Sequence, residues 1–127
     1  MMRRGLFGLV ATLMACVTPA LAHHSAAMFD RTKTVELVGT VKEYQFANPH
    51  VWIEVIVTGD DGKVVQWSIE GEGPAMMARM GLGPTVLKTG DKITMRAHPL
   101  RDGRPGGSFI AVTLEDGKVI ETMRLPQ

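Results

Sequence analysis

Apolar and polar residues alternate along three stretches of the chain, at 34–46, 50–58 and 63–70. A period of two residues places one set of side chains on a single face of an extended strand. In the second stretch, Val51, Ile53 and Val55 face one way, whereas Trp52 faces the other. The alternation therefore predicts β-strands with one buried face and one open face.

Short breaks between and within these stretches predict how the strands are joined and bent. Asn48-Pro49 predicts a turn between the first two strands, because proline cannot donate a ladder hydrogen bond. Asp61-Gly62 supplies the positive φ of a tight hairpin turn. Gly39 lies inside the first strand and predicts a bend or bulge of the kind that lets a small sheet curl.

The remaining elements complete a small all-β fold. Residues 74–80 carry three methionines at helical spacing, after a proline suited to the first turn of a helix. Further strands are predicted at 92–97, 108–114 and 119–123. This order predicts a small five- to six-stranded OB-like barrel with one short helix between strands three and four. A five-stranded sandwich with a helical plug is the alternative.

Residues 1–22 have the pattern of a cleaved secretory signal peptide. A basic start is followed by an apolar run over 5–17 and by the small-x-small site Ala20-Leu21-Ala22. The run is shorter than the roughly 20 apolar residues that span a bilayer. We therefore expect a periplasmic or secreted protein that is not transmembrane after cleavage, with a polar leader opening a single domain at 23–127. A lipoprotein anchored through Cys16 is the alternative.

Cleavage after Ala22 also changes the charge and the thiol content of the chain. Loss of Arg3 and Arg4 reduces the 14 Lys and Arg residues to 12, against 13 Asp and Glu. Because the sequence has no Lys/Arg block and no basic residues interleaved with aromatic ones, no nucleic-acid partner is expected. The one cysteine, Cys16, leaves with the signal, so the mature domain has no disulfide and no thiolate ligand.

The sequence predicts no enzymatic activity. No motif supplies a nucleophile, a base and an orienting partner together. Glu70 and Glu72 flank Gly71 at a strand end, where solvated turn carboxylates are the simpler interpretation. The protein is therefore interpreted as a binding domain.

The histidines that remain after cleavage are the candidate metal ligands, namely His23, His24, His50 and His98. Cleavage after Ala22 would expose an α-amine on His23, so the amine and ring nitrogens could hold one metal ion. Imidazole suits copper and zinc, and an amine with an imidazole particularly suits Cu(II). The pattern predicts an exported domain that binds copper or zinc through its processed N-terminus. Plain surface or turn histidines are the alternative.

The predicted topology bears on which histidines can meet. His50 begins the second strand and His98 ends the fourth, and both strands run antiparallel to the first. Ideal strands would place these two residues at opposite ends of the barrel. The leader joins the start of the first strand, so His23 and His24 are expected to reach His98 more easily than His50.

A second interpretation is a metal-free module that binds a periplasmic ligand or protein. Trp52, Tyr44 and Phe46 flank the Asn48-Pro49 turn and would form its aromatic contact surface. A Cu(II) and Zn(II) titration of the processed protein separates the two interpretations, because only the first requires His23.

Several short segments form a pattern along the mature chain: Ala22-His23-His24-Ser25 with Met28-Phe29-Asp30, Gly39-Thr40-Val41-Lys42-Glu43, Asn48-Pro49-His50-Val51-Trp52 with Trp67 and Gly90-Asp91, and His98-Pro99-Leu100-Arg101-Asp102-Gly103 with Gly106-Gly107. By this pattern the chain resembles a family of small secreted bacterial proteins known only as a domain of unknown function. The resemblance implies export and a barrel-like domain, but no established activity. Leu82 departs from the family, which often has a bulky aromatic residue there.

Overall fold

The computed structural model describes residues 25–122. In chain order its elements are α1 (Ser25–Met28), β1 (Val35–Gln45), β2 (Trp52–Thr58), β3 (Val64–Glu70), α2 (Pro74–Arg79), β4 (Lys92–Pro99), β5 (Gly106–Thr113) and β6 (Val119–Glu121). The predicted order of three strands, a helix and further strands is confirmed, and α1 is an addition within the leader. The predicted signal peptide at residues 1–22 lies outside the described residues.

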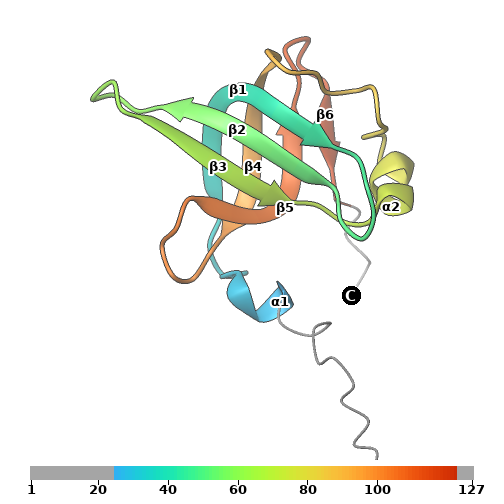
Figure 1. The fold of residues 1–127 in the computed structure, drawn as a ribbon, viewed down its shortest axis with the longest axis horizontal. Helices are drawn as coiled ribbons and strands as arrows, with labels where there is room; N and C mark the ends of the chain where they lie inside the picture. Colours follow the sequence, from blue (N-terminus) through green and yellow to red (C-terminus); the bar gives the residue numbers. More distant parts are fainter. Residues whose placement is uncertain (1–24, 123–127) are drawn as a thin grey trace, which may run out of the picture.

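Five of the strands close into a barrel, and β6 extends the sheet beyond it (Figure 1). The hydrogen-bonded order is β3-β2-β1-β4-β5-β6, and a parallel pairing between β3 and β5 joins the two sides. All the other pairings are antiparallel. The expected all-β, OB-like barrel is therefore correct, and the sandwich alternative is not formed.

Alternate residues of the strands fill the barrel, as the sequence pattern predicts. Val51, Ile53 and Val55 are fully buried, because their side chains point inward on one side of the pleat. Met77 of α2 is also fully buried and packs with this core, whereas Met76 on the same helix is 41% exposed. The short helix thus covers the core with one face and leaves its other face exposed.

β1 is irregular at a different place from the one predicted. Gly39 pairs with β4 in unbroken register, and the register shifts instead between Val41 and Glu43, where β1 meets β2. Gly39 is nevertheless needed for close packing, since a β-carbon there would collide with the backbone oxygen of Ile56 and lie 2.9 Å from a methyl of Val55. The bulge bends β1, while Gly39 lets β2 approach it.

None of the described helices is both long and apolar enough to cross a membrane.

Candidate functional site

His50 lies in the turn between β1 and β2, after a cis peptide bond between Asn48 and Pro49. Two backbone hydrogen bonds hold this turn against the end of β3: Val51 N–H donates to Glu72 O at 3.0 Å, and Gly71 N–H donates to Val51 O at 2.7 Å. The His50 ring therefore lies beside the segment that leaves the barrel after β3.

The imidazole of His50 is oriented by its Nδ1 atom. Nδ1 lies 3.0 Å from the carbonyl oxygen of Gly71 and 3.6 Å from a carboxylate oxygen of Glu70. A carbonyl oxygen only accepts hydrogen bonds, so Nδ1 carries the proton and donates it. In the neutral ring, Nε2 is then left with a lone pair.

His98 has the same arrangement at the end of β4. Its Nδ1 lies 2.8 Å from the carbonyl oxygen of Lys33, in the leader just before β1. Nδ1 again donates, and Nε2 of the neutral ring keeps its lone pair. Both described histidines therefore have one nitrogen fixed by the backbone and one available to a ligand.

Closure of the barrel brings the two histidines to the same end. Trp52 on β2 pairs with Glu70 on β3. Glu70 pairs in turn with Ser108 on β5, and Ser108 pairs with His98 on β4. His50 lies two residues before Trp52, and its ring is hydrogen-bonded to Gly71, the residue after Glu70. The expectation that His50 and His98 lie at opposite ends is therefore wrong, because it treated the sheet as open and left out the β3–β5 pairing.

Two neighbouring pockets lie at this end of the barrel. One, of about 110 Å³, is lined by His50 and Glu70, and the other, of about 520 Å³, is lined by His98. Arg31, Glu72 and Ser108 line both pockets. These three residues, which sequence reasoning did not select as site residues, therefore lie between the histidines. Glu72 could have been selected from the sequence, because two carboxylates flank Gly71 at a strand end. No sequence pattern distinguishes Arg31 or Ser108 in this way.

The leader is attached beside these pockets. Asp30 N–H donates to Pro99 O at 2.8 Å, and Arg101 donates from its backbone N–H to Met28 O at 2.9 Å and from Nε to Ala27 O at 3.1 Å. Phe29 forms an isolated bridge with Leu100 and is only 6% exposed. These contacts fix the start of the described chain at the histidine end of the barrel.

Asp30 is engaged within the leader itself. Its carboxylate accepts hydrogen bonds from the Thr32 hydroxyl at 2.6 Å and from the Thr32 backbone N–H at 3.1 Å. These hydrogen bonds lower the pKa of Asp30, with smaller contributions from the charges of Lys33 and Arg101. Asp30 is therefore a charged anchor of the leader.

His23 and His24 lie outside the described residues. Ala26, two residues after His24, lines the same pocket as His50. Within residues 25–122, no three His, Cys, Asp or Glu side chains are grouped closely enough to hold a metal ion.

The three aromatic residues of the turn do not form one surface. Trp52 faces outward and lines an apolar groove of about 400 Å³ together with Met28, Phe29, Leu100 and Pro105. Tyr44 and Phe46 instead pack against the core, with ring centroids 5.9 Å apart in an edge-on arrangement. Of the three predicted contact residues, Trp52 alone lines the groove.

A model of the DUF6152 family, described as a family of unknown function, matches residues 11–109. The chain belongs to this family. No curated protein sequence matches this DUF6152 member. Among solved structures, it is similar to the mitochondrial single-stranded DNA-binding protein Rim1 of S. cerevisiae, with 9% sequence identity and a TM-score of 0.49, over 72% of this chain and 96% of that one.

Tyr44 serves the fold of this DUF6152 member. Its hydroxyl lies 3.2 Å from the carbonyl oxygens of both Leu82 and Gly83 and shares its one proton between them, which ties β1 to the segment after α2. Burial of the ring raises the pKa of Tyr44 from 10.0 to about 12. Between those two pH values the unfolded chain ionises while the folded chain keeps its proton.

We expect Tyr44→Phe to lower the free energy of unfolding at neutral pH by about 0.5–1.5 kcal/mol, the net value of one hydrogen bond. Since the folded state binds more protons above pH 10, the stability of the wild type should also fall as the pH rises from 10 toward 12. Urea unfolding across this range measures both effects. Tyr44 is the only tyrosine, so phenolate absorbance reports its titration directly. An equally steep decline in Tyr44→Phe would contradict the assignment.

Proposed function

We propose that this protein is an exported binding domain, periplasmic or secreted, that holds a copper or zinc ion at the histidine end of the barrel. The ligands are the processed N-terminus at His23, with His24, and one or both of His50 and His98. The observation that carries the proposal is the shared orientation of His50 and His98. Each donates from Nδ1 to a backbone carbonyl and keeps an Nε2 lone pair.

This orientation is the one that metal-binding histidines commonly have. A ligating imidazole usually donates its other ring N–H to a carbonyl or a carboxylate, which fixes the tautomer and makes the ligating nitrogen more basic. Gly71 O and Glu70 would serve His50 in this way, and Lys33 O would serve His98. Imidazole nitrogen suits copper and zinc, and the addition of an amine nitrogen favours Cu(II).

The position of the leader supports the choice of ligands. Consecutive Cα atoms are about 3.8 Å apart, so the Cα of His24 lies within about 7.6 Å of the Cα of Ala26. Ala26 lines the pocket of His50. This shared pocket supports including His50 among the ligands, beside His98, the partner of the leader histidines expected from the sequence.

The second candidate function is a metal-free module that binds a small ligand or a protein at Trp52. It is favoured by the apolar groove of about 400 Å³, a volume in the usual range for ligand sites. Tyr44 and Phe46, predicted with it, contribute to the core instead. We propose no nucleic-acid partner: single-stranded DNA is named for the Rim1 structure only, and the charge pattern of this chain supplies no basic surface run.

The test is a Cu(II) and Zn(II) titration of protein that begins at His23. We expect a dissociation constant below about 1 μM, corresponding to more than about 8 kcal/mol of binding free energy. His50→Gln and His98→Gln should each be titrated, and the variant with the weaker affinity identifies the barrel ligand. Trp52→Ala is the control, since it should keep the metal affinity. Binding no tighter than micromolar in the processed protein would overturn the metal proposal and leave the groove as the candidate site.

A further inference from the structure

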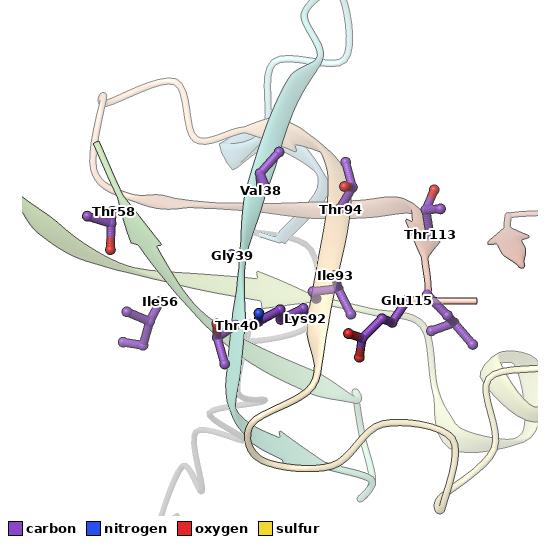
Figure 2. Close-up of a pocket in the computed structure, with 11 residues that line it drawn as sticks. Val38, Gly39, Thr40, Ile56, Thr58, Lys92, Ile93, Thr94, Thr113 and Glu115 are labelled. Carbon is purple, nitrogen blue, oxygen red and sulfur yellow. The ribbon is translucent and has the colours of Figure 1, made fainter. Parts of the chain in front are cut away.

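β1 and β2 separate at the end of their shared ladder. Their pairing extends in one direction only as far as Thr40↔Ile56. The next hydrogen-bonded rung in this register would join Val38 to Thr58, and that rung is absent between these two described strands. Figure 2 shows Val38 and Thr58 on either side of the opening. We call the opening between Val38 and Thr58 the β1–β2 split.

The edge of β1 that faces the split carries free backbone groups. Val41 N–H donates to Asp91 O at 2.9 Å, on the β4 side of β1. The backbone N–H and C=O groups of successive residues point to alternate sides of a strand. Gly39 lies two residues before Val41, so its backbone groups also face β4. The N–H and C=O groups of Glu36 and Val38 then face the split. Nothing in the described part of the chain pairs with them.

An exposed apolar side chain lies at the split. Val38 is 69% exposed, the largest exposed fraction among the large apolar side chains of residues 25–122. A cavity of about 460 Å³ adjoins the split and is lined by residues of β1, β2, β4 and the end of β5, among them Ile56, Lys92 and Thr94. An open strand edge that carries an exposed apolar side chain readily pairs with another chain, and the usual protections are proline, charged side chains or a covering segment. Within the described residues, the edge at Glu36 and Val38 has no proline and no covering segment, although Glu36 is charged and Lys92 lines the neighbouring cavity.

We infer that the β1–β2 split binds an extended segment of a partner polypeptide, which adds to β1 as an antiparallel strand. Unpaired N–H and C=O groups at strand spacing are matched by the main chain of another polypeptide. Cross-strand neighbours then specify its side chains. The guest residue opposite Val38 is apolar, and the residue opposite Glu36, two positions later in the guest, is Lys or Arg.

The probe is the peptide acetyl-Thr-Thr-Val-Thr-Lys-Thr-amide, added to the isotope-labelled protein and followed by NMR. We expect saturable shifts of the Glu36 and Val38 amides and slower hydrogen exchange at both, with an affinity of about millimolar strength. N-methylation of the peptide valine should weaken binding by about tenfold, because its N–H pairs with Val38. N-methylation of the final threonine, which lies beyond the paired residues, is the control.

Two protein variants test the side-chain contacts. Val38→Glu should weaken peptide binding by about tenfold, whereas Val119→Glu, at a valine that is 55% exposed on β6, should leave it unchanged. Glu36→Lys should reverse the charge preference and bind the peptide that carries glutamate in place of lysine. The amide spectrum confirms that each variant folds.

The inference is overturned if millimolar peptide gives no saturable shifts at Glu36 and Val38. It is also overturned if the shifts fall on the outer edge of β3, near Val64 and Gln66, or if the protein associates with itself through the split and excludes the peptide.

Discussion

Acetylation of the α-amine of His23 is expected to weaken Cu(II) binding by more than about a hundredfold. Acetylation converts the terminal amine into an amide and leaves no free amine beside the His23 ring, so the chelate loses one ligand. Loss of an outer-shell partner alone costs about 10- to 100-fold in metal affinity, so loss of a ligand should exceed that range. Isothermal titration of the processed form and of its acetylated counterpart measures the difference.

Thermal unfolding supplies an independent measurement of the same effect. Copper at about 100 times its dissociation constant should raise the free energy of unfolding of the processed form by about 2.7 kcal/mol. The acetylated form should gain far less, and chelation should return the processed form to its metal-free stability. The two metal-free forms should unfold alike. Equal copper affinity in both forms would show that the amine of His23 is not a ligand.

Gly39→Ala is expected to lower the free energy of unfolding by about 2–4 kcal/mol, at the upper end of what overpacking costs. The new methyl group would collide with the backbone oxygen of Ile56 and lie 2.9 Å from a methyl of Val55. The backbone oxygen belongs to the β1–β2 ladder, so it can move only if the ladder moves. Chemical denaturation at constant pH measures the change.

Gly83→Ala is the matched control for this substitution. No atom lies within 4 Å of a β-carbon built at Gly83, and its φ is not positive. This change should leave stability within about 0.5 kcal/mol of the wild type or raise it slightly, by restricting the unfolded chain. Similar losses in the two variants would show that the close approach at Gly39 is not what makes glycine necessary.

The local pattern of the sequence was sufficient to predict the elements of the fold. Period-two alternation located the strands, and the burial of Val51, Ile53 and Val55 agrees with it. The residues at 74–80 were correctly interpreted as a short helix, observed as Pro74–Arg79. These features depend on residues that are close together in the chain, so a single sequence is enough to predict them.

Two properties of the site could not be predicted, for different physical reasons. The register shift between Val41 and Glu43 reverses which residues of β1 point inward, so Tyr44 and Phe46 join the core while Trp52 of β2 faces outward. No residue type at that point requires the shift.

The shared position of His50 and His98 depends instead on the closure of the barrel. The parallel β3–β5 pairing that produces it includes Glu70 and Ser108, which are far apart in the sequence. Strand alternation contains no information about how far a curved sheet is sheared when it closes.

The attachment of the leader has a kinetic consequence. Residues 25–31 are held to the barrel by a few hydrogen bonds to Pro99 and Arg101 and by the buried ring of Phe29, whereas every barrel strand pairs with a neighbouring strand on both sides. Segments with few buried contacts open locally at a lower free-energy cost than the global unfolding of the domain. An ion shared between the leader and the barrel would therefore be released when the leader frays, and its residence time would be set by that opening while the barrel stays folded.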